Sequence, residues 1–108
     1  MSLKDKSCIP CKGGIPPISY DEENKLIKKL EGWQLIRNGI HKISKDFTFK
    51  NFKKSMSFVN KVAQVAEEQG HHPNIEIRYN KVHLELYTHA IKGLHENDFI
   101  LAAKIDSI

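Results

Sequence analysis

Hydrophobic and polar positions alternate with two different periods along this chain. Apolar residues recur every three or four positions between residues 50 and 69, which predicts an amphipathic helix of about five turns. The apolar face of this predicted helix consists of Phe52, Met56, Val59, Val62, Ala63 and Ala66. Gly70 follows as a typical helix end. Residues 75–79 and 82–87 instead alternate one by one, which predicts two half-buried strands joined tightly at Asn80-Lys81.

The N-terminal half of the chain predicts a further helix and a hairpin. The run Ser19-Tyr20-Asp21-Glu22 has the form of a capping box, so a helix should begin at Ser19 and end before Gly32. Residues 33–37 and 40–47 are expected to form two strands. Asn38-Gly39 between them is the strongest signal for a two-residue hairpin turn.

A last helix, from about Glu96 to Ile105, completes the order helix, two strands, long helix, two strands, helix. This order predicts an α+β fold, with a four-stranded antiparallel sheet and about three helices packed on one face. We expect an N-terminal arm over residues 1–18 and one folded domain over residues 19–108. The other sheet face and the sheet edges are left to solvent or to another subunit.

Composition narrows the classes of function. Hydrophobic residues make up 40% of the chain and charged residues 28%, as in ordinary globular domains. No apolar run approaches the ~20 residues that a membrane span needs, and the polar N-terminus does not resemble a secretory signal. A cytoplasmic protein is expected. The formal net charge is +4, with lysines near residues 50–61 that we interpret as a solvated face, so we expect neither a nucleic acid nor a membrane as partner.

Cys8 and Cys11 have the C-x-x-C spacing of zinc and redox sites. A structural zinc ion usually takes four nitrogen or sulfur ligands, and the sequence contains no second pair of this kind. A redox motif would follow a strand and begin a helix, whereas these cysteines precede a run rich in glycine and proline. Their role stays open, with metal binding as the minor alternative.

Three of the six histidines occupy places where functional groups are common. His71 and His72 follow the long helix and precede a proline, and His89 follows the last strand. The start of one predicted strand and the end of its hairpin partner lie at the same end of the sheet, so the three imidazoles can converge there. Histidine exchanges protons near neutral pH, because its ordinary pKa is ~6.5. We interpret His41, His83 and His95 as surface or satisfied residues.

A metal site is the competing interpretation, since three imidazoles can bind zinc. Adjacent histidines are a poor chelate for one ion, because side chains of neighbouring extended residues point in roughly opposite directions. The residues alone therefore leave both proton transfer and ordinary structural roles open for His71, His72 and His89.

The run Glu67-Glu68-Gln69-Gly70-His71-His72-Pro73, followed by Tyr79, His89 and Asp98, resembles the signature of the pterin-4a-carbinolamine dehydratases. The similarity covers roughly residues 19–108 and includes Gly32-Trp33, Thr88-His89 and Gly93-Leu94. The sequence departs from the family at Gly70, where an aspartate is often found, and at His95, where threonine or serine is common.

The resemblance implies a hydro-lyase that removes water from 4a-hydroxytetrahydrobiopterin to give quinonoid dihydropterin. It implies His71, His72 and His89 as catalytic residues, with His71 and His89 as the stronger candidates for proton transfer. The substrate-binding residues that it implies, besides these histidines, are Gly70, Tyr87, Thr88, Ala90, Glu67 and Asp98. No metal and no other cofactor is implied, because the pterin is the substrate.

The family also forms dimers or tetramers, so a homo-oligomer is expected. The resemblance also implies a place in the pathway of an aromatic amino acid hydroxylase, which produces the substrate. Two alternatives remain at this stage. One is a protein of the same fold that acts on another pterin, and the other is a dimerisation or interaction module without catalysis. The intact set of three histidines favours an enzyme over a pure interaction module, but it does not separate the two kinds of enzyme.

Overall fold

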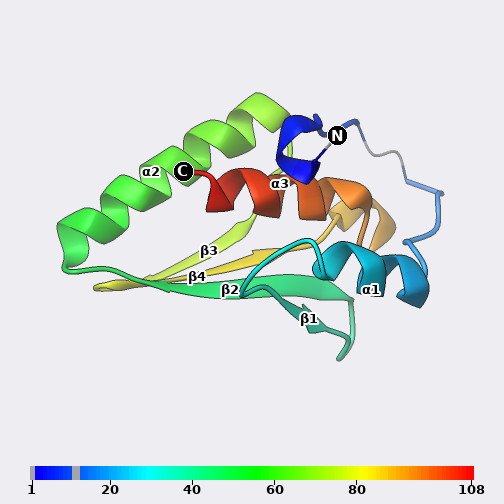
Figure 1. Cartoon of the computed structure of the whole chain (residues 1–108), viewed down its shortest axis with the longest axis horizontal. Coiled ribbons are helices and arrows are strands. Elements are labelled where there is room, and N and C mark those ends of the chain that lie inside the picture. Colours follow the sequence, from blue (N-terminus) through cyan, green and yellow to red (C-terminus); the bar gives the residue numbers. More distant parts are fainter. Residues whose placement is uncertain (1, 11–12) are drawn as a thin grey trace.

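The computed structural model describes residues 2–10 and 13–108, and it has the predicted order of elements. The helices are α1 (Tyr20–Ile27), α2 (Phe52–Gln69) and α3 (Glu96–Asp106), and the strands are β1 (Gln34–Ile36), β2 (Lys42–Thr48), β3 (Asn74–Arg78) and β4 (Lys81–Leu86). Short 3₁₀ turns lie at Leu3–Asp5 and His89–Ile91. The strands form one antiparallel sheet in the order β1-β2-β4-β3, and the three helices lie on one side of it (Figure 1). The predicted α+β class is confirmed.

Polar side chains set the helix ends. The Ser19 hydroxyl accepts a hydrogen bond from the Glu22 N–H, which begins α1 where the capping motif predicts it. The Asn51 side chain does the same for Lys54 at the start of α2. Gly70 ends α2 with a φ of 63°, a left-handed conformation that glycine adopts without steric cost. The last turn of α2 therefore stops at a defined point, directly before His71.

Both hairpin predictions were wrong in detail. Ile36 pairs with Lys42, so residues 37–41 form a longer loop in place of a two-residue turn at Asn38-Gly39. In the second hairpin Arg78 pairs with Lys81, which moves the turn one residue toward the N-terminus, to Tyr79-Asn80. Asn80 is held there from outside the hairpin, since its carbonyl accepts from the Phe49 N–H at 2.7 Å and its side-chain amide donates to the Phe49 carbonyl at 3.1 Å.

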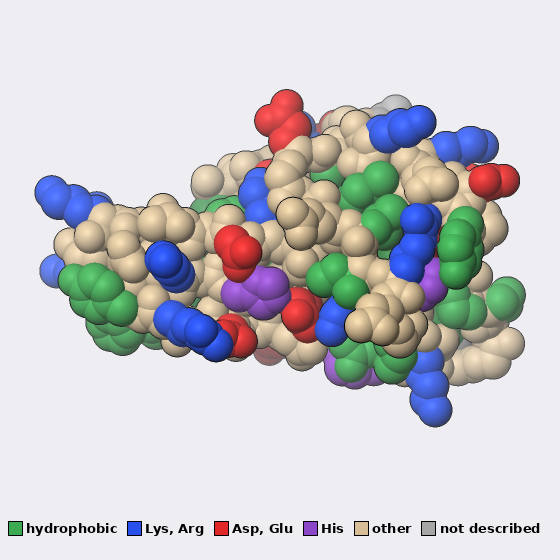
Figure 2. All heavy atoms as spheres, turned by 90° about the horizontal axis from the view of Figure 1, so that it is seen from below, with side chains coloured by type: hydrophobic (Ala, Val, Ile, Leu, Met, Phe, Trp, Pro, Cys, Tyr) green, Lys and Arg blue, Asp and Glu red, His purple; other side chains and the backbone are tan. Residues whose placement is uncertain are grey.

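The two faces of the sheet differ in chemistry. Ile43 and alternate residues of β4 are buried beneath the helices. The open face, viewed in Figure 2, carries acidic, basic and histidine side chains; one row across three strands consists of Asp46, His83 and Glu76. The prediction that β3 is half buried was wrong, because Ile75 and Ile77 are 37% and 36% exposed. β3 is an edge strand with β4 as its neighbour in the sheet, and the helices leave its apolar side chains uncovered.

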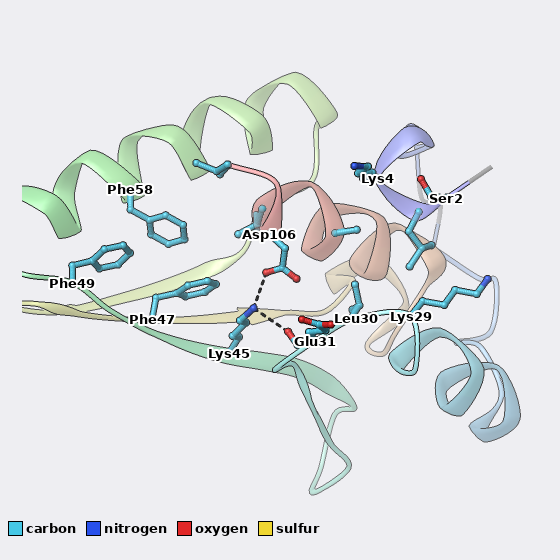
Figure 3. Close-up of a pocket in the computed structure, with 14 residues that line it drawn as sticks. Ser2, Lys4, Lys29, Leu30, Glu31, Lys45, Phe47, Phe49, Phe58 and Asp106 are labelled. Carbon is cyan, nitrogen blue, oxygen red and sulfur yellow. Dashed lines mark hydrogen bonds and ion pairs between the residues drawn. The ribbon is translucent and has the colours of Figure 1, made fainter.

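A hollow of about 730 Å³ is lined by residues of α2, of β2, of the C-terminal end of α3 and of the segments 2–4 and 29–31 (Figure 3). Its aromatic wall is formed by Phe47, Phe49 and Phe58. The Lys45 ammonium group donates to the Asp106 carboxylate and to the Glu31 carbonyl, each at 2.9 Å.

The buried face of α2 is rotated from the predicted one. Ser55, Val62 and Ala66 are buried, whereas Phe52 and Ala63, which were expected on the apolar face, are exposed.

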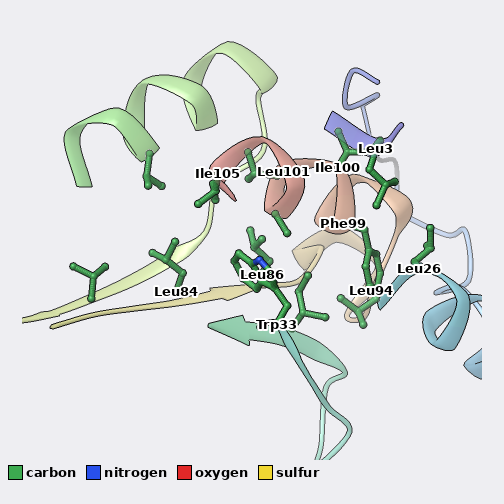
Figure 4. Close-up of a cluster of buried hydrophobic side chains, with 14 residues drawn as sticks. Leu3, Leu26, Trp33, Leu84, Leu86, Leu94, Phe99, Ile100, Leu101 and Ile105 are labelled. Atoms are coloured by element: carbon green, nitrogen blue, oxygen red, sulfur yellow. The ribbon is translucent and has the colours of Figure 1, made fainter. Parts of the chain in front are cut away.

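The hydrophobic core lies between α3 and the centre of the sheet (Figure 4). Its largest wholly buried apolar side chains come from β2, β4, α3 and the loop before α3: Ile43, Leu84, Leu86, Leu94, Phe99, Leu101 and Ile105. The N-terminal segment, expected as a separate arm, adds Leu3 to this core. Lys6 forms an ion pair with Glu96 at 2.9 Å, and the Lys104 ammonium group donates to the Lys4 carbonyl at 2.8 Å. Residues 3–6 are thus packed against α3.

Candidate active site

A small pocket opens where the loop after α2 meets the loop after β4. Residues 70–73 form one wall, and residues 88–90 form another. Pairing of Asn74 with Glu85 fixes the two loops at the same end of the β3–β4 hairpin. The pocket has a volume of about 290 Å³, just below the ~300–1,000 Å³ of small-molecule sites. It is lined by Ile9, Gly70, His71, His72, Pro73, Asn74, Thr88, His89, Ala90 and Asn97.

His71 is the most firmly held of the three predicted histidines. Its Nε2 lies 2.5 Å from an Asp98 carboxylate oxygen, and its own backbone N–H donates to the Ala66 carbonyl at 3.2 Å. The Asp98 side chain is 0% exposed and accepts two more hydrogen bonds, from the Thr88 hydroxyl at 2.9 Å and the His95 N–H at 3.0 Å. A carboxylate with three donors has its oxygens fixed, so it fixes the orientation of the imidazole as well.

His72 and His89 are more open to solvent. His72 Nε2 contacts the Glu67 carboxylate, and both side chains of this pair are largely exposed. His89 begins the 3₁₀ turn after β4, and its ring packs against that of Tyr87 with the centroids 4.2 Å apart. The three histidines therefore share one pocket but differ in support, from a buried carboxylate to a surface carboxylate and an aromatic ring.

The structure divides the predicted binding residues into two groups. Six of them line the pocket: Gly70, His71, His72, Thr88, His89 and Ala90. The other three, Glu67, Tyr87 and Asp98, lie outside the lining, and each contacts one of the histidines. Sequence reasoning missed Ile9, Pro73, Asn74 and Asn97. Pro73 and Asn74 continue the histidine run and could have been found from it, whereas no local signal connected Ile9 to this site.

The remaining histidines have carboxylate or capping partners. His41 Nδ1 lies 2.8 Å from a carboxylate oxygen of buried Glu23. His83 lies between Asp46, at 2.6 Å, and Glu85, at 3.0 Å. The hydrogen bond to the Asp46 side chain and then that to Glu85 raise the pKa of His83 above its ordinary 6.5. The pKa of Glu85 is lowered, first by its hydrogen bond to His83.

His95 has a structural role that the sequence did not indicate. Its Nδ1 accepts a hydrogen bond from the Asn97 N–H at 3.0 Å, and its own N–H donates to Asp98. These two bonds form a capping box at the start of α3. Threonine or serine, common here in the family that the sequence resembles, would cap through a hydroxyl oxygen. A ring nitrogen does this work at His95, and the same box helps to hold Asp98 beneath His71.

Comparison with known proteins identifies the family. The family model described as pterin 4 alpha carbinolamine dehydratase matches residues 16–108. The chain belongs to the pterin-4-alpha-carbinolamine dehydratase family. A family member from Nitrosomonas eutropha, provisionally named a pterin-4-alpha-carbinolamine dehydratase, is 50% identical over 107 residues, which cover 98% of this chain and 92% of that protein. A protein of the same provisional name from Rubrobacter xylanophilus is 42% identical over 106 residues, covering 98% of this chain and 97% of its own length.

Solved structures agree with this family. The crystal structure of a transcriptional coactivator/pterin dehydratase from Brucella melitensis superposes with a TM-score of 0.79 at 32% identity, covering 84% of this chain and 96% of that one. A pterin dehydratase-like protein described as a RuBisCO assembly factor of the alpha-carboxysome shares the fold, with a TM-score of 0.61 at 24% identity, covering 71% of this chain and 88% of its own. The dehydratase fold thus occurs in proteins whose titles give them different functions.

Within residues 2–10 and 13–108, no group of three or more His, Cys, Asp or Glu side chains is arranged to hold a metal ion. No helix of the described part of the chain is long and apolar enough to cross a membrane. Cys11, the second cysteine of the C-x-x-C spacing whose role the sequence leaves open, lies outside the described residues.

Proposed function

We propose that this protein removes water from 4a-hydroxytetrahydrobiopterin to give quinonoid dihydropterin, by histidine acid/base catalysis. The observation that supports this most is the His71–Asp98 pair, set in a pocket that His72 and His89 also line, in a member of the dehydratase family. Dehydration needs no nucleophile and no electron transfer. It needs groups that move protons at a fixed place, and a histidine with a fixed ring is suited to this.

The reaction breaks the C4a–O bond and forms a C4a–N5 double bond. The departing hydroxyl takes up a proton and leaves as water, while N5 loses its proton. One group must therefore donate a proton and one must accept a proton, on two neighbouring atoms of the ring. A pair of imidazoles in one small pocket can do both near neutral pH.

The contacts suggest a division of work among the three histidines. Asp98 engages Nε2 of His71, so Nδ1 is the nitrogen of that ring available to the substrate. His89, on the wall formed by residues 88–90 and packed against Tyr87, is the second proton-transfer group. His72, on the surface beside Glu67, positions the pterin. No cofactor takes part in this scheme, in which the pterin is the substrate.

The test is a stopped-flow assay of 4a-hydroxytetrahydrobiopterin dehydration with purified protein treated with a chelator. The wild-type protein should accelerate the reaction, and His71→Ala and His89→Ala should each lower the rate by a large part of the ~10²–10⁴-fold typical of acid/base groups. His83→Gln is the matched control, because His83 also binds carboxylates but lies on the open sheet face. Absence of acceleration by the wild-type protein would refute the proposal, and activity lost on chelation and restored by zinc would replace it with a metal mechanism.

The Brucella relative, whose title includes the words transcriptional coactivator, favours one alternative, an interaction module built on the same fold. A module would retain its partner binding when His71 and His89 are replaced together. A third alternative is catalysis on a different pterin. In that case the protein would not accelerate dehydration of the carbinolamine in the same assay, but it would consume another pterin. The intact histidine pocket makes the dehydratase our first choice.

We further propose that the protein assembles into a homo-oligomer through β3. In the proposed function it acts in one pathway with an aromatic amino acid hydroxylase, whose product is its substrate. β3 is an edge strand with exposed Ile75 and Ile77, and exposed Tyr79 follows it. An uncovered apolar edge of this kind is a common pairing site for a second copy. Light scattering after size exclusion should show a dimer or larger, and Ile77→Lys should shift it toward the monomer; a monomeric wild-type protein contradicts this proposal.

A further inference from the structure

Residues 8–10 lie beside the histidine pocket although they are far from it in the sequence. The backbone N–H of Cys8 donates to the Gln69 side chain at 2.9 Å, next to the end of α2. The backbone of Ile9 is held on both sides by the Asn97 amide: its N–H donates to Oδ1 at 3.0 Å, and its carbonyl accepts from Nδ2 at 2.6 Å. These bonds tie the segment to α2 and α3, the two helices whose ends flank the pocket.

Asn97 is buried, with only 2% of the residue exposed. A buried amide is costly when its polar atoms lack partners, and here both side-chain polar atoms bond the same stretch of backbone. The segment and the helix therefore depend on one another: lifting Ile9 away would break two hydrogen bonds inside the protein at once. This coupling distinguishes the segment from an ordinary terminal tail.

Ile9, in contrast, is 61% exposed although it is a large hydrophobic residue that lines the pocket. An exposed isoleucine adds little to the stability of the fold. The other lining residues are three histidines, two asparagines, Gly70, Pro73, Thr88 and Ala90, so Ile9 is the largest aliphatic side chain that this pocket offers to a flat ring. Burial of its apolar surface would occur when a ligand binds, not when the chain folds.

The chain also follows the second wall of the pocket farther along. A Cβ on Gly13 would lie 3.4 Å from the Ala90 carbonyl oxygen, so Gly13 runs close to the turn that carries His89. A Cβ on Gly93 would lie 2.7 Å from Pro17, and the Ile18 N–H donates to the Leu94 carbonyl at 3.0 Å. The described parts of the N-terminal segment thus lie against the 3₁₀ turn and the second half of the loop after β4.

We propose that residues 8–10 form a fixed wall of the active site, with Ile9 as an apolar contact for the pterin ring and Asn97 as the positioning residue that holds Ile9 there. The inference rests on the proposed function and adds a determinant of substrate affinity to it. Ile9 contributes binding but no proton transfer, so its loss weakens substrate binding and leaves the chemical step intact.

The experiment measures kcat and KM separately, together with the Kd of 7,8-dihydrobiopterin as an unreactive probe. Ile9→Ala should raise KM and Kd about fivefold, as expected for loss of an apolar contact, with kcat within about twofold. Ile15→Ala is the matched control, since Ile15 is an exposed isoleucine of the same N-terminal segment that does not line the pocket. An unchanged KM and Kd in Ile9→Ala would refute the proposed role of residues 8–10 as a wall of the active site. The dehydratase activity of the wild-type protein would not be affected by that result.

Asn97 is tested by hydrogen exchange as well as kinetics. Asn97→Ala should raise KM and accelerate amide exchange at Ile9, whereas Asn97→Asp keeps the acceptor for the Ile9 N–H and should preserve more of the protection. Fast exchange at Ile9 in the wild-type protein would show that the segment is not docked and would overturn the inference. A wild-type protein without dehydratase activity would refute the proposed function itself, an outcome distinct from both. If Asn97→Ala fails to fold, the Ile9→Ala measurement decides.

Discussion

Two histidines of this protein, His71 and His83, bind carboxylates at distances of 2.5 Å and 2.6 Å and yet lie in opposite environments. His71 lines a pocket, and its partner Asp98 is wholly buried. His83 lies on the open face of the sheet, and its partner Asp46 has a side chain that is 81% exposed. A close distance between the two groups is therefore a poor guide to what the pair does.

The difference lies in what surrounds the carboxylate. Asp98 accepts hydrogen bonds from Thr88 and from the His95 backbone in addition to His71, so its position is set by the start of α3 and the loop after β4. Asp46 projects into water, where solvent competes with His83 for its oxygens. A fixed carboxylate can hold a proton-transfer group in one orientation, and a solvated one cannot. The burial and the hydrogen bonds of the partner carboxylate therefore indicate the role of a histidine better than the distance between the two groups does.

The largest expected effect is a loss of kcat when Asp98, the carboxylate behind His71, is replaced. Asp98→Asn keeps the size of the side chain but weakens the bond that orients the His71 ring. We expect kcat to fall on the order of 10²–10⁴-fold, as for other orienting carboxylates of catalytic histidines. Asp46→Asn, the matched change on the open sheet face, should leave kcat unchanged in the same stopped-flow assay. Equal losses in the two variants would show that burial does not distinguish the two pairs.

Stability should separate the two carboxylates as well. Asp98→Ala leaves the donors of Thr88, His95 and His71 without their acceptor in a buried place, which should cost about 3 kcal/mol of unfolding free energy. Asp46→Ala should change it by no more than about 0.5 kcal/mol, because exposed ion pairs contribute little. Urea unfolding monitored by circular dichroism measures both, and a loss at Asp98 as small as that at Asp46 would contradict this account.

The ion pairs of His83 should make the stability of the protein depend on pH. The raised pKa of His83 means that its contribution to stability is present below its ordinary 6.5 and is lost as pH rises through the higher folded value. The lowered pKa of Glu85 gives a contribution that is present above 4.5 and is lost as pH falls through the folded value. The stability difference between the wild-type protein and His83→Gln should therefore be greatest between about pH 4.5 and 6.5.

Nuclear magnetic resonance titration of the His83 ring provides the direct measurement. Its pKa should lie above 6.5 in the wild-type protein and move back toward that value in Asp46→Asn, since the hydrogen bond to Asp46 is the largest cause of the shift. A His83 ring that titrates below 6.5 in the wild-type protein would show that desolvation outweighs the two carboxylates.

The smallest effect concerns the pair between His72 and Glu67. Both side chains are exposed, so Glu67→Gln should change the free energy of unfolding by at most about 0.5 kcal/mol. Thermal unfolding of Glu67→Gln, measured beside the Asp98 and Asp46 variants, shows which of the two its loss of stability resembles. A cost near that of Asp98→Ala would mean that His72 is held as firmly as His71 and would assign it a larger part in proton transfer.

Local sequence signals found the parts of the fold that depend on few residues. The period of three to four residues located α2, and Gly70 ended it at the predicted point because a left-handed residue there closes the last turn. The S-x-x-E motif located the start of α1. The sequence predicted the turn after β3 at Asn80-Lys81, one residue beyond its actual place at Tyr79-Asn80. Asn80 is held by Phe49, a partner 31 residues distant in the sequence that no local pattern reveals.

The candidate site divides in the same way. The histidine run, His89 and their resemblance to one family come from the sequence, because they are identities at fixed spacing. The tertiary structure decided that Asp98 supports His71, that His95 caps α3 beside it, and that β3 keeps its isoleucines exposed. It also brought Ile9 to the pocket through Asn97, a contact 88 residues apart. Spacing along the chain determines local conformation, but only the packing of distant segments determines which neighbour each polar side chain has, and that neighbour sets its chemistry.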